Sequence, residues 1–150
     1  REIRRYRPEV VICSYPLRTL DGMWGGGHPD HLAAGEATLS AIFPAARDHL
    51  TFPELLEQGF EPHKVSEVWI TGHPEPDLWI DVTEHIDTSI EALRQHKSQL
   101  SNSDGIGDRM KEWKRHRAEG KGMVYAETFK RISYDRQQPP PLLVRPGNRD

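Results

Sequence analysis

Two imidazoles and one carboxylate lie within four residues of the 150-residue chain, at His28, Asp30 and His31. A run of three glycines precedes them, and the apolar, helix-forming segment 32–43 follows. Histidine binds metal ions through a neutral ring nitrogen, and it also transfers protons near neutral pH. The spacing is compatible with two metal ligands, with one ligand and one acid–base group, or with two histidines that only cap a helix.

A strand and a helix are predicted to position this motif. The β-branched and almost continuously apolar segment 9–15 is typical of a strand buried on both faces of a parallel sheet. In open α/β sheets, ligands bind beyond the carboxyl ends of the strands, where the loop 16–27 and the histidines would lie. Pro29 suits the first turn of a helix, so His31 is expected at a helix N-terminus. The positive end of the helix dipole favours the neutral ring that a metal requires.

The remaining chain predicts further strands and helices in alternation. Short helices are expected at 1–6 and 53–58, strands at 65–71, 78–82 and 123–132, and longer helices at 84–100 and 108–118. Thr83 is expected to cap the helix that follows it. The pattern predicts an α/β fold, a three-layer Rossmann-like domain with a mostly parallel sheet. We assign residues 1–135 to this domain and residues 136–150 to an extended, proline-rich tail.

Composition and charge argue against several classes of function. The formal net charge is −3, so no overall basic field favours nucleic acid as a partner. The mean hydropathy of −0.73 marks a polar chain. No apolar stretch approaches the roughly 18 residues that span a bilayer, and the first residues lack a signal-peptide core. The single cysteine, Cys13, can form no internal disulfide, which favours a reducing compartment. We expect a cytoplasmic protein with a small-molecule partner, no nucleic-acid partner and no membrane span; a homo-oligomer stays open.

Several other polar residues are weaker candidates. Basic and acidic residues interleave on the helix predicted at 108–118, which favours a solvated face over a nucleic-acid surface. Four of its five Lys and Arg residues are candidate nucleic-acid contacts, namely Lys111, Lys114, Arg115 and Arg117. His96 and Gln99, near the end of the preceding helix, suit packing or capping at least as well as a site. His73 lies in a proline-rich segment and is expected to be a turn residue rather than a ligand.

The segment 27–35, GHPDHLAAG, resembles the second motif of the LmbE/PIG-L family of zinc-dependent N-acetylglucosamine de-N-acetylases. Further segments resemble the family in the expected order, namely 7–11, 79–83, 96–99 and 125–129. One departure is the glycine run, where relatives often place an aromatic residue just before the histidine; Trp24 is the candidate substitute. The resemblance implies that residues 1–135 are the C-terminal portion of one LmbE-like deacetylase domain.

The resemblance also implies a role for each residue of the motif. His28 would donate a proton or stabilise an oxyanion, Asp30 would orient it, and His31 would bind zinc. The family's other motif, an N-terminal His-Pro-Asp-Asp segment, supplies two more zinc ligands and the aspartate that activates water. This chain has no such segment, because its other His-Pro pair, at 73–74, continues as Glu-Pro. A catalytic zinc ordinarily has three protein ligands. We therefore expect the chain alone to be inactive, and an upstream segment to carry the first motif.

For the complete protein, the resemblance implies hydrolysis of an N-acetyl amide on an amino sugar or glycoconjugate, with Zn²⁺ as the cofactor. Two alternatives stay open. One is another metal-dependent hydrolase, such as a phosphoesterase, which would need further Asp or His ligands. The other is a non-catalytic carbohydrate-binding or interaction module derived from a deacetylase.

Overall fold

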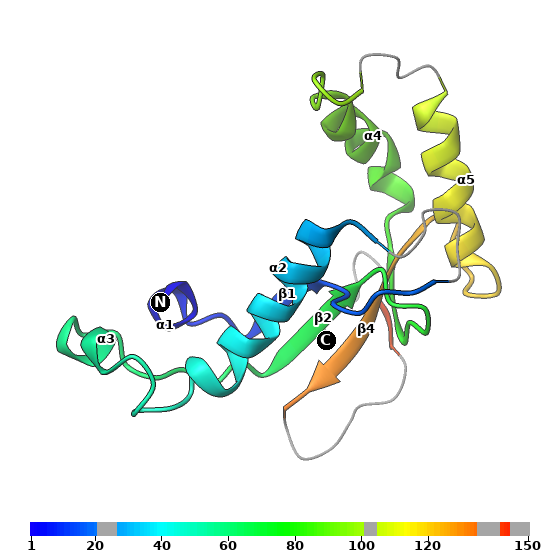
Figure 1. Ribbon diagram of the computed structural model, residues 1–150. Helices are drawn as coiled ribbons and strands as arrows, with labels where there is room; N and C mark the ends of the chain where they lie inside the picture. The colour runs from blue at the N-terminus through cyan, green and yellow to red at the C-terminus, as the bar shows by residue number, and fades with distance from the viewer. Residues whose placement is uncertain (21–26, 101–104, 135–141, 145–150) are drawn as a thin grey trace. The chain divides into compact units, whose positions relative to one another are not determined.

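The structure is a computed structural model that describes residues 1–20, 27–100, 105–134 and 142–144 (Figure 1). The chain divides into two compact units. The first comprises Arg1–Glu75 with Phe129–Pro139, and the second comprises Pro76–Thr128 with Pro140–Asp150. Across the described ranges, no helix has the length and apolar character needed to cross a membrane.

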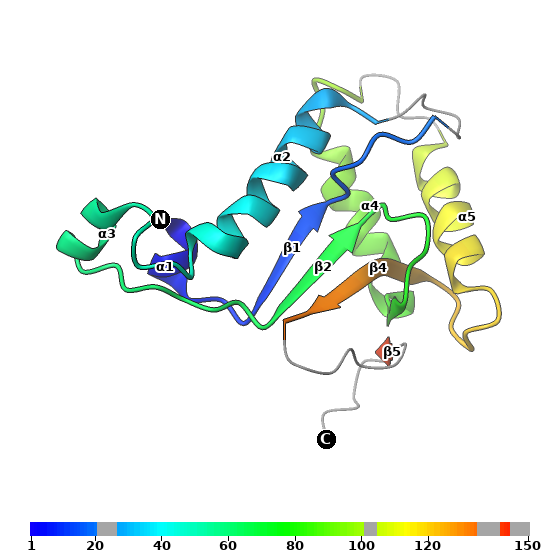
Figure 2. The same cartoon turned by 60° about the horizontal axis from the view of Figure 1, so that its bottom comes forward.

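Within the described residues, five strands form a mixed sheet with the order β1-β2-β4-β3-β5. They are β1 (Val10–Ser14), β2 (Glu67–Thr71), β3 (Leu78–Asp81), β4 (Ala126–Ser133) and β5 (Leu142–Val144), the last of which lies within the predicted tail. β1 pairs with β2 in parallel, whereas β4 runs antiparallel to β2 (Figure 2). β3 and β5 also pair in parallel. The expected mostly parallel sheet is therefore a mixed one. The residue pattern of a strand does not encode its direction, which its connections set.

In the first unit, helix α2 (Pro29–Ser40) packs on one face of β1 (Figure 1). The buried residues of this core are Cys13, Ile42, Val65, Val68 and Ile70. The other face of β1 is open, because Ile12 keeps 58% of its surface exposed. Successive side chains of a strand point to opposite faces, so Val11 and Cys13 reach the core and Ile12 does not. The prediction of a strand buried on both faces at 9–15 is wrong for this chain.

Helix α2 ends earlier than its apolar pattern predicts. A single wide turn, η1 (Ala41–Ala45), follows it, and Phe43 leaves helical geometry there with φ −143°. Pro44 disfavours the helical region for the residue before it, which accounts for the early end. The two short helices predicted in this unit are present as α1 (Glu2–Tyr6) and α3 (Pro53–Glu57).

In the second unit, helices α4 (Ile86–Arg94) and α5 (Ile106–Ala118) pack together. The helix predicted at 84–100 begins as a short 3₁₀ turn, η2 (Thr83–His85), and ends at Arg94. After Leu93 the chain offers only polar residues until Leu100, and all of them are exposed. With no apolar side to bury, the helix does not continue.

Thr83 does not cap the helix that follows it. Its hydroxyl donates to the Asp81 carboxylate and accepts the N–H groups of Val124 and Tyr125, both at 3.2 Å. The side chain therefore joins the end of β3 to the segment that leads into β4. A local pattern predicts a cap, but it cannot reveal a more distant donor that competes for the same oxygen.

Helix α5 carries the basic residues that were expected on a solvated face. Arg115 is exposed, but Lys114 is only 3% exposed and forms an ion pair with Glu127 of β4. Residues four apart share one side of a helix, and Ala118 is buried with Lys114. The expectation of a solvated face is wrong for Lys114, because its position in the helical period turns it toward β4.

Candidate active site

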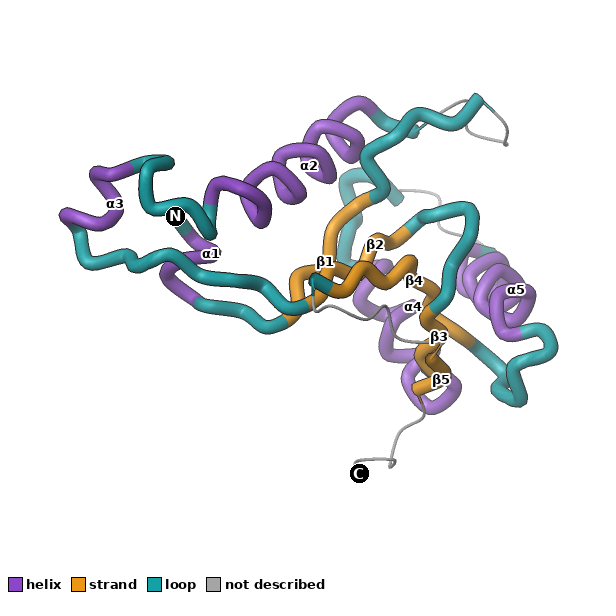
Figure 3. Tube along the Cα trace, turned by 90° about the horizontal axis from the view of Figure 1, so that it is seen from below, coloured by secondary structure: helices purple, strands orange, loops and turns teal. Residues whose placement is uncertain are grey.

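A pocket of about 420 Å³ lies at the carboxyl ends of β1 and β2. The loops that leave these two strands emerge at the same end of the parallel pair (Figures 2 and 3). The pairing places Ser14 opposite Thr71, and the N–H of Tyr15 donates to the Thr71 carbonyl at 3.0 Å. All three residues line the pocket, together with His28 and His31 at the start of α2. The strand-end location expected from the sequence is where the pocket is found.

His28 is the N-cap of α2 and has extended backbone geometry. Its Nδ1 accepts the backbone N–H of Asp30 at 3.2 Å. Because an accepting nitrogen carries no hydrogen, this bond places the hydrogen of a neutral ring on Nε2. The Asp30 carboxylate lies 3.8 Å from the same Nδ1, and both side chains are largely exposed. The main chain of Asp30 therefore holds the ring, with the carboxylate close enough to pair with a protonated imidazole.

His31 lies in the first turn of α2, where the sequence predicted a helix N-terminus. Its N–H donates to the His28 carbonyl at 3.0 Å, and the two ring centroids are 5.8 Å apart. Both rings line the same pocket. The structure thus brings the two histidines together on one wall, with the His31 ring at the positive end of the helix dipole.

Gly35 fixes how closely α2 approaches β1. It is buried, and a Cβ added there would lie 2.3 Å from the carbonyl oxygen of Ser14. A glycine inside a helix is usually unfavourable, so its presence indicates a close approach of two backbones. This contact, which sequence reasoning missed, holds the histidines against the end of β1.

The described residues alone do not fit a zinc site. Among them, no group of three or more His, Cys, Asp and Glu side chains is placed to hold a metal ion. His28 and His31 offer two imidazoles at most, whereas a catalytic zinc ordinarily has three protein ligands. Cys13 offers no alternative, because burial raises the pKa of its thiol and disfavours the thiolate.

The four other candidates from the sequence have different outcomes. His96 and Gln99 belong to the second unit and are exposed in the turns after α4. Trp24 lies outside the described residues. His73 does lie in a turn, but its ring also packs edge-on against Tyr15, with the centroids 4.7 Å apart.

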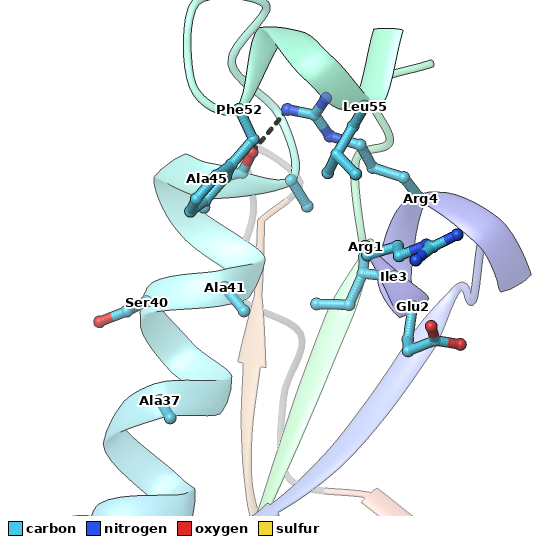
Figure 4. Close-up of a pocket in the computed structure, with 11 residues that line it drawn as sticks. Arg1, Glu2, Ile3, Arg4, Ala37, Ser40, Ala41, Ala45, Phe52 and Leu55 are labelled. Atoms are coloured by element: carbon cyan, nitrogen blue, oxygen red, sulfur yellow. Dashed lines mark hydrogen bonds between the residues drawn. The ribbon is translucent and has the colours of Figure 1, made fainter. Parts of the chain in front are cut away.

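A second pocket, of about 470 Å³, lies between α1, α2 and the segment around α3 (Figure 4). Small and apolar side chains form most of its wall, including Ile3, Ala41 and Leu55. Arg4 is 3% exposed, and its Nη2 donates to three backbone carbonyls of the 45–51 segment at 2.7–2.8 Å. The described residues of this lining include no imidazole or thiol. We therefore place the candidate chemistry in the pocket that holds the histidines.

Taken together, the fold and the pocket define an α/β protein with a histidine-lined site beyond a pair of parallel strands. No protein-family model matches the chain. A 1D-myo-inositol 2-acetamido-2-deoxy-alpha-D-glucopyranoside deacetylase of Saccharopolyspora erythraea is 33% identical over 128 residues, covering 69% of this chain and 42% of the relative. A diacetylchitobiose deacetylase of Thermococcus kodakarensis is 28% identical over 98 residues, covering 65% of this chain and 34% of the relative.

Two solved structures share the fold. An N,N'-diacetylchitobiose deacetylase from Pyrococcus horikoshii superposes with a TM-score of 0.76 at 19% identity, covering 88% of this chain and 48% of that chain. The conserved protein TT1542 from Thermus thermophilus gives a TM-score of 0.64 at 24% identity, covering 99% and 60%. The chain is thus a distant homologue of the LmbE-like deacetylases, over a part of their length. It spans less than half the length of these two curated relatives.

Proposed function

We propose that the complete protein carrying this chain hydrolyses an N-acetyl amide on an amino sugar or glycoconjugate. The observation that carries the proposal is the pair of histidines on one wall of a strand-end pocket, in a chain homologous to deacetylases. The names of both relatives describe substrates that carry acetylated amino groups on sugar units. The sugar and its attached group are left open, since the two named substrates differ.

The chemistry of amide hydrolysis matches what His28 offers. Negative charge develops on the carbonyl oxygen in the transition state, and the leaving amine needs a proton. The Nε2–H of a neutral His28 is a hydrogen-bond donor for that oxygen, and a protonated ring can supply the proton. The Asp30 carboxylate, 3.8 Å from Nδ1, would stabilise the charged ring. We propose His28 and Asp30 as this catalytic pair.

We propose His31 as one ligand of a Zn²⁺ ion whose other ligands lie outside the described residues. Zinc, when bound, supplies a Lewis acid for the carbonyl and lowers the pKa of a water molecule. The contribution of this chain is a neutral imidazole held in the first turn of α2. The close contact at Gly35 keeps that turn against β1.

A substrate panel tests the class of reaction. The complete protein would be incubated separately with N-acetylglucosamine, diacetylchitobiose and a phosphate monoester, and the released acetate, amine and phosphate would be measured. We expect one acetate and one free amine for each bond cleaved, and no phosphate. Release of phosphate would instead support a phosphoesterase. Sugar binding without any product would support a non-catalytic carbohydrate-binding module.

A further inference from the structure

A second His-Pro-acid segment repeats the local geometry of the first. In the segment 28–30, Nδ1 of the histidine accepts the N–H of Asp30 at 3.2 Å. In the segment 73–75, Nδ1 of His73 accepts the N–H of Glu75 at 3.0 Å. The first segment follows the loop that leaves β1, and the second follows β2 directly. Two imidazoles are thus fixed in the same way beyond the carboxyl ends of two parallel strands.

His73 is next to two residues that line the pocket of the candidate active site. The residue before it, Gly72, lines the pocket and has a positive φ of 76°, which turns the chain sharply after β2. The His73 ring packs edge-on against Tyr15, another lining residue, at an interplanar angle of 71°. Tyr15 is itself bonded through its N–H to Thr71. These contacts place His73 at the margin of the pocket.

The hydrogen bond at Nδ1 determines what the His73 ring can offer. A neutral ring that accepts at Nδ1 carries its hydrogen on Nε2. Within the described part of the chain, no hydrogen-bond partner for Nε2 is recorded, and the side chain is half-buried. Nor do the described residues combine His73 with two further metal-ligating side chains. His73 therefore presents one directional N–H donor beside the aromatic ring of Tyr15.

We infer that His73 is a specificity-determining residue, whose Nε2–H donates to an oxygen of the sugar unit beyond the one that carries the scissile acetamide. Sugar hydroxyl and ring oxygens accept such a bond, and the apolar face of a sugar suits an aromatic neighbour such as Tyr15. The inference rests on the proposed function. It assigns His73 to substrate binding, whereas the proposed catalytic roles belong to His28 and His31.

Two variants of the complete protein separate this bond from simple structural roles. His73→Phe keeps an aromatic ring against Tyr15, whereas His73→Asp keeps an acceptor for the N–H of residue 75, as in an Asx turn, and adds no donor. Both lack the Nε2–H donor. We expect each to raise KM for diacetylchitobiose about tenfold while kcat stays within about twofold, because one hydrogen bond to a hydroxyl is lost. KM for N-acetylglucosamine, which lacks the distal unit, should not change. His49→Phe, which alters an exposed histidine outside the pocket lining, is the matched control.

The outcomes distinguish a failure of the role inferred for His73 from a failure of the proposed deacetylase function. If the wild-type protein releases acetate and both His73 variants keep the wild-type KM for diacetylchitobiose, the inference is wrong. A fall in kcat with KM unchanged would also overturn it. If the wild-type protein releases no acetate from any substrate, the proposed function fails. The ring nitrogens of His73 would then be followed by NMR while chitobiose is added, and an unchanged Nε2 resonance would overturn the inference as well.

Discussion

The positions of His28 and His31 depend on a glycine that carries no chemistry of its own. Gly35 lies where a Cβ would come within 2.3 Å of the Ser14 carbonyl oxygen, so any side chain must push α2 away from β1. We expect Gly35→Ala to lower the free energy of unfolding by about 1–3 kcal/mol, the usual cost of overpacking. Urea denaturation followed by circular dichroism measures this loss.

Gly59→Ala is the matched control for that substitution. Gly59 has a positive φ of 81°, but no atom lies within 4 Å of its potential Cβ. Alanine at this position should lower the free energy of unfolding by about 1 kcal/mol, because only the left-handed backbone conformation is unfavourable for it. Gly35→Ala should therefore cost more than Gly59→Ala, and it alone should impair the histidine pocket. A Gly35→Ala protein as stable as the wild type would refute the close-approach explanation.

At the scale of elements, Arg4 joins α1 to the segment between η1 and α3. Its buried Nη2 donates to the carbonyls of Ala45, Asp48 and Thr51. Arg4→Met keeps an unbranched apolar stem but leaves these acceptors without their charged donor. We expect a loss of about 3 kcal/mol in the free energy of unfolding, since bonds to charged groups are worth about 1.5–3 kcal/mol each and the segment can partly relax into water.

The neighbouring arginine provides the control. Arg5 is exposed, and its side chain forms an ion pair with Glu2 at 3.7 Å and lies over the Tyr6 ring, both within the same helix. Such surface pairs contribute about 0–1 kcal/mol, so Arg5→Met should leave the stability nearly unchanged. Equal losses for the two variants, compared in parallel thermal melts, would show that Arg4 does not hold this segment.

The apolar pattern predicted where most elements lie, because burial of side chains depends on local periodicity. It placed the strands at β1, β2 and β3 and the helices at α2, α4 and α5 within a few residues. It could not predict the direction of β4 or the buried ion pair of Lys114. Each of these depends on partners distant in the sequence.

The residues of the candidate site likewise fall into those that the sequence predicted and those that it did not. His28, Asp30 and His31 lie within one short segment, so residue types and spacing were enough to single them out. Tyr15 was not singled out, and His73 was expected to be a turn residue, because only the parallel pairing of β1 and β2 brings their loops together. The sequence offered one clue, the repeat of the His-Pro-acid pattern of residues 28–30 at residues 73–75. The repeat points to the site only when the geometry of the segment 28–30 is known.

At the scale of the whole molecule, the chain spans only part of the length of its relatives. We propose that it is one portion of a three-layer Rossmann-like domain, and that other parts of the complete protein supply the remaining zinc ligands. This proposal accounts for a pocket that carries two histidines while the described residues hold no three-ligand group. His28 and His31, together with the zinc ligands from those other parts, would form the catalytic centre.

The most direct test of this account is the rate of acetate release by the complete protein carrying His31→Ala, measured together with its zinc content. Loss of one zinc ligand should lower acetate release at least a hundredfold and reduce the bound zinc, while the fold, followed by circular dichroism, is retained. His49→Ala, which alters an exposed histidine outside the pocket, should keep both the rate and the zinc. Acetate release at the wild-type rate by His31→Ala would contradict the account.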